Sequence, residues 1–348
     1  MLNNKYLRIA RRIINDPERK SLSTMLLETC HLWVRNKHFP TYYFTRLLFL
    51  PDWGDYRDYI STRELFKIIY SEKIQSHDIV EILNDKIRFA KFCLKNNLPA
   101  PKLLGYSIRN EFIFKEVSFE IKNISDAMAF FDQLFHEFGL SKIIIKNIAS
   151  KGGRGIIVLN KNHLKEQLTA VYDTLVNQSY IFQEIVSNHH LIDEIYAHSV
   201  NTLRVDTVFI DKEVHILGAC MRFGVGGNLI DNASAGGFYV PMDPISGTLW
   251  KYGVQNIQNN GRCFRKHPDT DFVLNGFEVP FYQESIQLVK ELTKLLPNRI
   301  IGWDIAITNE GPIVIEGNHD PGIVMTEISH KGYLKHPLIK RLWEIAET

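Results

Sequence analysis

The sequence contains few cysteines and no strong excess of either charge. Its 348 residues include four cysteines, and no two of them form a Cys-X-X-Cys pair. We therefore expect neither a disulfide framework nor a zinc site. The formal net charge is only +2, which gives no general attraction to nucleic acid. This composition predicts a cytoplasmic protein with reduced thiols and no nucleic-acid partner.

Long apolar runs are also missing. No run approaches the roughly 18 residues of a membrane-spanning helix, and the N-terminus lacks the apolar core of a signal peptide. Residues 1–80 are expected to be mostly helical, and they begin with apolar residues that alternate with Arg8, Arg11 and Arg12. Such a helix either rests on the inner face of a membrane or packs on its own domain, and we favour packing because most such helices do so.

Helical and strand-like patterns follow one another through the rest of the chain. Helices are expected after an N-cap at Asn84 or Asp85 and over 126–138, 163–176 and 281–296. Strands are expected over 112–122, 142–148, 156–159, 181–186, 199–210, 213–222, 300–308 and 312–318. The pattern predicts an α+β fold with mostly antiparallel sheets.

The last predicted strand ends in an unusual way. Its apolar residues 313–315 are followed by Glu316-Gly317-Asn318, and side chains alternate along a strand, so Glu316 and Asn318 share a face. On the preceding strand, Asp304 points away from Trp303 and the other apolar residues. If the two strands pair, these oxygens converge and suit Mg²⁺, with Mn²⁺ as the second choice. The alternative is a charged hairpin at the rim of a sheet, but the apolar neighbours favour the metal site.

A glycine-rich turn, SKGGRG at 150–155, follows a strand that carries Lys146 near its end. Lys151 and Arg154 supply positive charge, and the glycines at 152, 153 and 155 allow backbone N–H groups to surround anionic oxygens. The turn is not a Walker loop. Its alternative is an ordinary hairpin turn, and the nearby Lys146 favours a phosphate site.

Two arginines occupy the two strands of the predicted hairpin at 199–222. Arg204 and Arg222 could hold a transferring phosphoryl group or a substrate carboxylate in bidentate fashion, or they could form surface salt bridges. A second glycine-rich loop follows. We expect this loop, with Asn232, Gly236 and Gly237, to close over a ligand as a flap.

Taken in order, these motifs resemble those of the ATP-grasp ligases. The motifs are Asn84-Asp85-Lys86, Lys146, the glycine turn, Gln183-Glu184, "NTLR" at 201–204, "AGG" at 235–237 and "DIA…IEGN". The stretches "SVNTLRVDTV", "GGNLIDNASAGG" and "GPIVIEGN" resemble more narrowly the sugar-transfer-associated branch, which is found with bacterial surface-polysaccharide genes. The resemblance covers about 84–322. It implies an ATP-grasp fold, in which subdomains 81–186 and 187–348 grip ATP after a helical region at 1–80.

The resemblance also implies a role for each matching position. Lys86 and Lys146 would contact the phosphates and the adenine side of the cleft, and Lys151, Gly152, Gly153 and Gly155 would cover the phosphates. The adenine and ribose would meet Gln183, Glu184, Ile185 and Val186. Arg204 and Arg222 would stabilise the transition state, and Asp304, Glu316 and Asn318 would bind Mg²⁺.

The implied activity is an ATP-dependent carboxylate–amine ligase that works through an acyl phosphate. Its carboxylate would belong to a uronic acid of a capsular or other surface polysaccharide, and its amine to an amino acid or amino alcohol. One rival is a kinase on the same fold that phosphorylates a hydroxyl group. The other is a nucleotide-binding scaffold of a polysaccharide assembly complex. His319 and Asp320, just past the predicted metal site, receive no assignment.

Overall fold

The computed structural model describes residues 2–150, 152, 153, 155–228, 231, 236–259 and 261–348, without the side chains of residues 2–6. The chain divides into two units. The larger contains Met1–Val80, Asn188–Pro312 and Gly317–Thr348, and the smaller contains Glu81–Ser187 and Ile313–Glu316. Three predicted site positions, Lys151, Arg154 and Asn232, lie outside the described residues.

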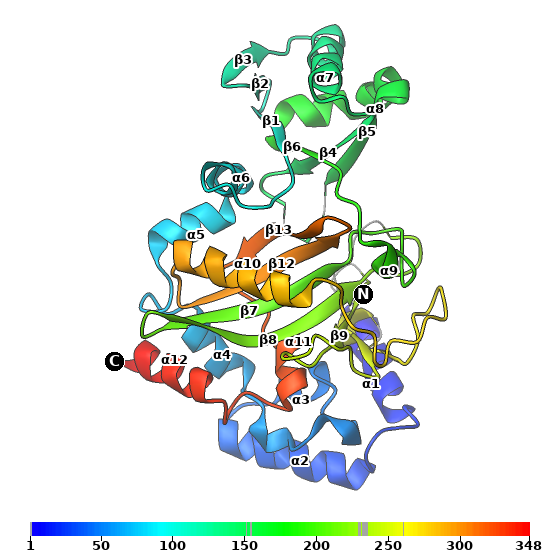
Figure 1. Ribbon diagram of the computed structural model, residues 1–348. Helices are drawn as coiled ribbons and strands as arrows, with labels where there is room; N and C mark the ends of the chain where they lie inside the picture. The colour runs from blue at the N-terminus through cyan, green and yellow to red at the C-terminus, as the bar shows by residue number, and fades with distance from the viewer. Residues whose placement is uncertain (1, 151, 154, 229–230, 232–235, 260) are drawn as a thin grey trace. The chain divides into compact units, whose positions relative to one another are not determined.

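The helices confirm that residues 1–80 are mostly helical. In chain order they are α1 (Leu2–Ile14), α2 (Leu22–Asn36), α3 (Thr41–Thr45), α4 (Thr62–Ile69), α5 (His77–Asn84), α6 (Lys86–Lys95), α7 (Ile124–Phe138), α8 (Leu164–Asn177), α9 (His190–Asp193), α10 (Tyr282–Leu295), α11 (Val324–Glu327) and α12 (Pro337–Glu347) (Figure 1). Short 3-10 helices are η1 (Pro51–Trp53), η2 (Tyr56–Asp58), η3 (Lys161–His163), η5 (Ile257–Asn259) and η6 (Ile328–His330). Asp85 caps α6, as predicted, because its carboxylate accepts hydrogen bonds from the N–H groups of Ile87 and Arg88.

The strands form two sheets. They are β1 (Leu103–Ile108), β2 (Glu111–Phe114), β3 (Val117–Glu120), β4 (Lys142–Asn147), β5 (Ile156–Asn160), β6 (Tyr180–Glu184), β7 (Thr202–Ile210), β8 (Glu213–Phe223), β9 (Phe238–Pro241), β10 (Gly253–Gln255), β11 (Cys263–Phe264), β12 (Ile300–Thr308) and β13 (Gly311–Asn318). The first sheet has the order β3-β2-β1-β6-β4-β5 and the second β11-β10-β9-β8-β7-β12-β13. Neighbouring strands run antiparallel, for example β7 with β8 and with β12. The predicted α+β class is confirmed.

One strand prediction before α7 was wrong. The stretch 112–122 is not one strand but the hairpin of β2 and β3, whose turn residues Lys115 and Glu116 have left-handed backbone angles. This turn carries no glycine, proline or asparagine, so no local pattern predicts it. Strand β1 was not predicted. β6 ends at Glu184, so Ile185 and Val186 lie beyond the strand.

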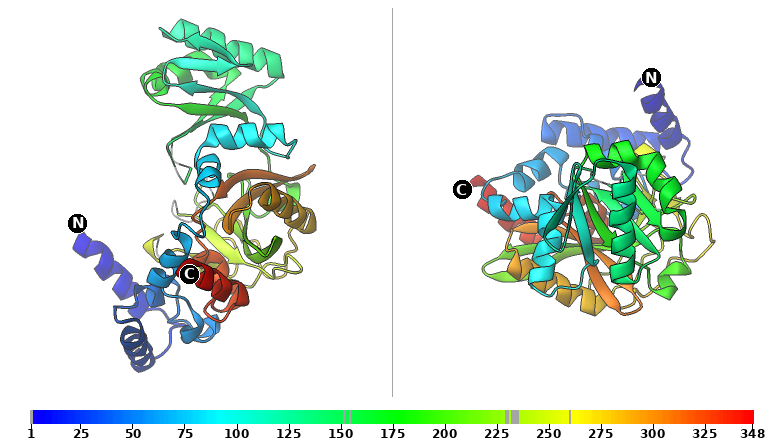
Figure 2. Two further views of the ribbon diagram at one scale, coloured as in Figure 1. Left: turned by 90° about the vertical axis from the view of Figure 1, so that its left-hand side faces the viewer. Right: turned by 90° about the horizontal axis from the view of Figure 1, so that it is seen from above.

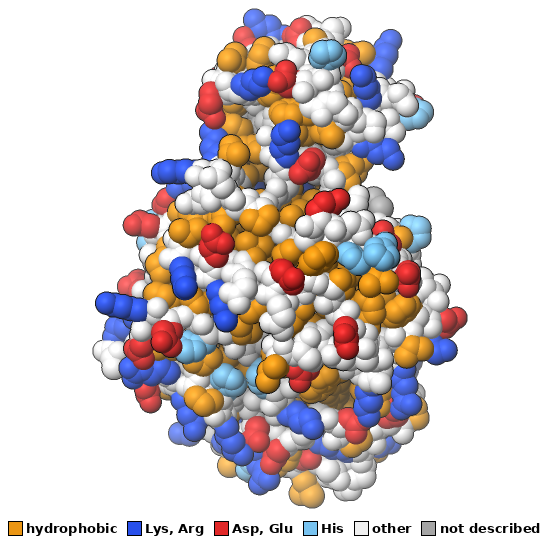
Figure 3. Space-filling view, in the orientation of Figure 1, with side chains coloured by type: hydrophobic (Ala, Val, Ile, Leu, Met, Phe, Trp, Pro, Cys, Tyr) orange, Lys and Arg blue, Asp and Glu red, His pale blue; other side chains and the backbone are white. Residues whose placement is uncertain are grey.

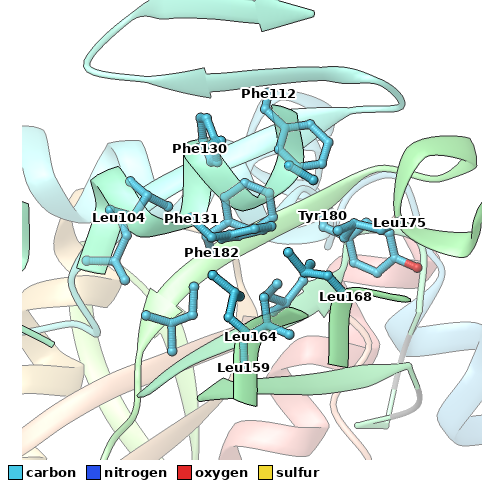
Figure 4. Close-up of a cluster of buried hydrophobic side chains, with 14 of the residues drawn as sticks. Leu104, Phe112, Phe130, Phe131, Leu159, Leu164, Leu168, Leu175, Tyr180 and Phe182 are labelled. Carbon is cyan, nitrogen blue, oxygen red and sulfur yellow. The ribbon is translucent and has the colours of Figure 1, made fainter. Parts of the chain in front are cut away.

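The smaller unit has its core between the first sheet and two helices. Helices α7 and α8 pack against each other, and side chains from both meet those of β1, β2, β5 and β6 (Figure 4). Aromatic rings dominate one end of this cluster. Phe112 lies edge-on to Phe130, with ring centroids 5.2 Å apart, and Phe131 lies edge-on to Phe182 at the same distance. Such edge-to-face pairs add specificity to apolar burial.

The sheet of the larger unit has different neighbours on its two faces. On one face Trp303 of β12 donates a hydrogen bond to Thr293 of α10 at 3.0 Å and to Thr207 of β7 at 3.1 Å. On the other face Asp206 of β7 accepts a hydrogen bond from Thr326 of α11 at 2.7 Å. Figure 2 shows α10, in orange-brown, along one side of this sheet. Because successive side chains alternate, the face of Asp206 is also the face of Arg204 and Thr202.

The N-terminal helical region is an integral part of the larger unit. Arg46 and Glu327 form a fully buried ion pair of 2.5 Å, and Glu327 also accepts the N–H groups of Ile60 and Tyr333. Ile13 of α1 is buried in the cluster that α2 and α3 share with the sheet, which confirms packing for this part of the first helix. Across the described residues, no helix is both long and apolar enough to cross a membrane.

Candidate active site

Three neighbouring strands of the larger unit bring charged residues onto one face of the sheet. Asp304 of β12 lies directly opposite Arg204 of β7, and Arg222 comes from β8, the next strand. The carboxylate of Asp304 accepts Nε of Arg204 at 2.6 Å and Nη2 of Arg222 at 2.8 Å. All three side chains are buried. The arginines therefore form buried ion pairs instead of the surface salt bridges considered above.

The ion pairs keep both guanidinium groups charged in a buried place. Burial would lower the pKa of Arg204, but the adjacent Asp304 carboxylate outweighs it and raises that pKa above its ordinary value. Buried charge-assisted pairs of this kind are short and directional. Arg204, Arg222 and Asp304 form a buried row across the sheet, with two fixed cationic groups beside a carboxylate. Phosphoryl transfer uses this electrostatic pattern.

Arg222 has a second set of partners on its other side. Its Nε donates to Oγ1 of Thr202 at 2.9 Å and lies 3.4 Å from Oδ2 of Asp231. The same oxygen of Asp231 accepts the backbone N–H of Thr202 at 2.9 Å and also the Thr202 hydroxyl. Burial raises the pKa of Asp231, and the positive charge of Arg222 opposes this rise. Asp231 thus holds part of the second glycine-rich loop against β7.

Asp206 continues the row beyond Arg204. Its Oδ2 accepts the Thr326 hydroxyl, whereas Oδ1 is buried and has no hydrogen-bond partner among the described residues. Burial raises the pKa of Asp206 to about 6, although Arg204 acts in the opposite direction. A Cβ atom at Gly302 would lie 2.7 Å from Oδ1 of Asp206 and 3.1 Å from Nη1 of Arg204. Any residue other than glycine at position 302 would displace these two charged groups.

Sequence reasoning missed Thr202, Asp206 and Asp231. The first two could have been found, since Thr202, Arg204 and Asp206 occupy alternate positions between the apolar Leu203 and Val205. Such alternation puts the polar residues on one face. Asp231 follows no periodic pattern, and only its contacts across the fold identify it.

The predicted metal ligands come from β12 and β13, which are neighbours in the order of the sheet. Asp304 is buried, whereas Glu316 and Asn318 are half-buried. Asn318 belongs to the larger unit and Glu316 to the smaller. Within the described part of the chain, no group of three or more His, Cys, Asp or Glu side chains is arranged to hold a metal.

The predicted phosphate lysines lie in the smaller unit. Lys86 Nζ donates hydrogen bonds to the backbone oxygens of Ile148 and Ser150, at 3.2 and 2.6 Å. These bonds stabilise the start of the glycine turn. Burial lowers the pKa of Lys146 to about 8; Glu316 opposes this shift and the positive charge of Lys86 adds to it. An amine with this pKa still carries a proton at neutral pH.

The glycine turn has the backbone that its sequence predicts. The three glycines at 152, 153 and 155 all have left-handed φ angles, of 71°, 75° and 72°. Residues with side chains rarely adopt such angles in succession. The turn joins β4 to β5, which pair antiparallel from Lys142↔Asn160 to Lys146↔Ile156.

The predicted adenine-side residues lie at the end of β6. The side chain of Gln183 is buried, and Oε1 of Glu184 accepts the backbone N–H of Lys102 at 2.8 Å. Ile185 is 38% exposed, and Val186 follows it outside the strand. This stretch therefore combines two polar side chains with an open segment of backbone.

The end of the second glycine-rich loop is closely packed. A Cβ atom at Gly237 would lie 2.5 Å from the backbone oxygen of Asp231 and 2.7 Å from that of Phe223. The backbone oxygen of Gly236 accepts the side-chain amide of Gln255 at 2.8 Å. Both glycines thus fix how the loop returns to β9.

A comparison with protein-family models assigns the chain to one family. Residues 65–341 match the family described as sugar-transfer associated ATP-grasp. No curated protein matches the sequence. Similar solved structures include D-alanyl-alanine synthetase A from Vibrio cholerae (12% identity, TM-score 0.45, covering 76% of this chain and 65% of that one), biotin carboxylase from Campylobacter jejuni (10%, 0.47, 77% and 47%) and L-amino acid ligase from Bacillus licheniformis (12%, 0.39, 72% and 43%). The chain thus spans less than two thirds of the length of each of these three proteins.

Proposed function

Because the chain belongs to the sugar-transfer associated ATP-grasp family, we propose that it is an ATP-dependent ligase that joins a carboxylate to an amine. The family match covers residues 65–341, which contain both sheets and every charged residue of the candidate site. The observation that carries the proposal is the buried row in which Arg204 and Arg222 both contact Asp304.

The proposed reaction has two steps. A carboxylate oxygen attacks the γ-phosphorus of ATP, the bond between that phosphorus and the β,γ-bridging oxygen breaks, and ADP leaves. The nitrogen of an amine then attacks the acyl carbon, the carbon–oxygen bond to the phosphate breaks, and the amine gives up a proton as the amide forms. Neither step needs a nucleophile from the protein, so positioning and charge neutralisation are the main contributions of the chain.

In this proposal Arg204 and Arg222 stabilise negative charge on the phosphoryl group and on the acyl phosphate. Their burial supports the role, because fixed cations act more strongly where water is excluded. Asp304 orients both guanidinium groups, and Asp231 holds Arg222 from the other side. The phosphates of ATP would also meet Lys86, Lys146 and the glycine turn at 150–155, and its adenine and ribose would meet residues 183–186.

Asp304, Glu316 and Asn318 would hold Mg²⁺, with Mn²⁺ as a substitute. Their donor set fits this ion, since two carboxylates and one amide oxygen are hard ligands and Mg²⁺ takes the rest of its shell from water and phosphate. When bound, the ion would neutralise phosphate charge. The loop with Asn232, Gly236 and Gly237 would cover the nucleotide.

For the substrates, we propose a uronic acid of a bacterial surface polysaccharide as the carboxylate and an amino acid or amino alcohol as the amine. The description of the family as sugar-transfer associated supports the first choice. The reaction is expected in the cytoplasm, where ATP is available.

The test is ATP turnover with a panel of uronic acids and amines, in which ADP and amide are measured together. We expect ADP release that requires both substrates and an amide of the expected mass. Glu316→Gln should abolish turnover, because the change removes one proposed metal carboxylate while keeping its shape. Phosphate retained on an acceptor without any amine would show a kinase, and ATP binding without turnover on any acceptor would show a scaffold; either result refutes the ligase.

A further inference from the structure

The outer face of α2 exposes an unusual amount of apolar surface. Leu26 is 65% exposed, Leu27 71% and Val34 81%, and Leu22 and Trp33 are each exposed by about half. At 100° per residue these five side chains fall within one sector of about 140°, where their only other helix neighbours are Ser23 and Cys30. No charged residue of the helix lies in this sector. We name these five residues the α2 apolar face.

This face is not the side by which the helix joins its own unit. Met25, Thr29 and Leu32 form the buried side of α2, and Met25 and Leu32 belong to the cluster that contains Ile13 and Tyr43. The α2 apolar face is therefore additional to the core. Its surface continues past the helix end, since the ring of Phe39, 48% exposed, lies edge-on to Trp33 at 5.7 Å. A contiguous exposed apolar patch of this kind marks a docking surface.

The charge of the N-terminal region indicates what this face docks on. Residues 1–51 contain nine Lys and Arg residues against three Asp and Glu residues, although the whole chain has a net charge of only +2. Each of the three acids lies in an ion pair: Asp16 with Arg12, Glu18 with Arg265 and Glu28 with Lys20. On the lower part of Figure 3, blue, red and orange side chains all lie at the surface of the larger unit.

Several exposed basic residues of this region have no such partner within the described part of the chain. Arg8, Arg11 and Lys37 form no ion pair within the part of the chain that the structure describes. The region therefore keeps a surplus of positive charge, which repels the same region of a second copy and attracts an anionic surface. An apolar helix face of leucine, tryptophan and valine, in a region rich in lysine and arginine, is typical of segments that lie in the headgroup layer of a bilayer.

We propose that the α2 apolar face docks the protein on an anionic lipid bilayer, where α2 lies parallel to the surface and Arg8, Arg11 and Lys37 contact the headgroups. The docking is peripheral and reversible, because a few side chains of one helix enter the interface. It does not depend on the proposed ligase activity, and its measurement needs no turnover.

The test is co-sedimentation of the full chain with lipid vesicles. Wild type should bind vesicles of phosphatidylglycerol and phosphatidylcholine in equal parts, bind pure phosphatidylcholine much more weakly, and be released as salt increases. The variant Leu26→Ser/Leu27→Ser/Val34→Ser should lose at least about tenfold in affinity for the anionic vesicles, since it removes most of the surface that inserts. Arg8→Gln/Arg11→Gln/Lys37→Gln should lose a similar factor and its dependence on salt.

A matched control separates docking from general surface apolarity. Ile245 is 81% exposed and lies outside this region, so Ile245→Ser should bind vesicles like wild type. All variants should keep the thermal midpoint of wild type, because each changed side chain points into solvent. Wild type that stays in the supernatant with anionic vesicles would overturn the proposal, and so would a triple-serine variant that binds normally. A wild-type dimer that the triple-serine change makes monomeric, without vesicle binding by either, would assign the face to a second copy and also overturn it.

Discussion

Replacement of Asp206 by asparagine should make the protein more stable at neutral pH. Asp206 is fully buried, one of its carboxylate oxygens has no hydrogen-bond partner among the described residues, and burial raises its pKa from 3.8 to about 6. The folded state therefore prefers the neutral form of this side chain, and its charge at pH 7 costs free energy. Asparagine has the shape of the neutral acid and can still accept the hydroxyl of Thr326.

The raised pKa sets the size of the effect. A rise of about two units corresponds to about 3 kcal/mol, at roughly 1.4 kcal/mol per unit. Since the pKa of the folded state lies above that of the unfolded state, the contribution of Asp206 to stability is fully present below pH 3.8 and is lost as the pH rises through about 6. Asp206→Asn should escape this loss, so it should exceed wild type by up to about 3 kcal/mol above pH 7 and match it near pH 4.

The assay is urea denaturation of both proteins across this pH range. Asp211→Asn serves as the control, because Asp211 is an exposed carboxylate at the turn between β7 and β8, and its change should leave the pH profile as in wild type. ATP turnover should fall in Asp206→Asn. The buried carboxylate of Asp206 lowers stability at neutral pH, and we expect such a charge beside Arg204 to contribute to activity. A variant that is less stable than wild type at pH 7, or a difference that does not change with pH, would refute this account of Asp206.

Two further predictions concern Gly302, which lies beside Asp206, and Lys146 of the smaller unit. Gly302→Ala should lower the free energy of unfolding by about 1–3 kcal/mol, because the new methyl group would lie 2.7 Å from Asp206 Oδ1. The control is Gly322→Ala, whose Cβ would meet nothing closer than 3.7 Å and which should be nearly neutral. Equal effects of the two changes in urea denaturation would contradict the steric argument. The apparent KM for ATP should rise as the pH passes about 8, where Lys146 loses its proton. Lys146→Arg should remove this rise, because arginine stays charged. An unchanged pH profile of KM in the arginine variant would assign the titration to another group.

Much of the architecture could be predicted from local patterns. The helical character of 1–80, the cap at Asp85, the hairpin through Asp211-Lys212 and the last two strands all depend on signals within a few residues of one another. The hairpin of β2 and β3 could not be predicted in this way, because its turn uses lysine and glutamate at left-handed angles that only the surrounding sheet enforces.

For the site, local sequence patterns show which residue types are available and on which side of a strand each one lies. Alternation along β7 and β12 placed Arg204 and Asp304 away from the apolar faces of their strands, but it did not say what each would contact. That was decided by pairing between segments far apart in the chain: Asp304 meets Arg204 across 100 residues, and Asp206 meets Thr326 across 120. A side chain's partners, its burial and hence its pKa depend on strand register and packing, which are properties of the whole fold and not of any one stretch of sequence.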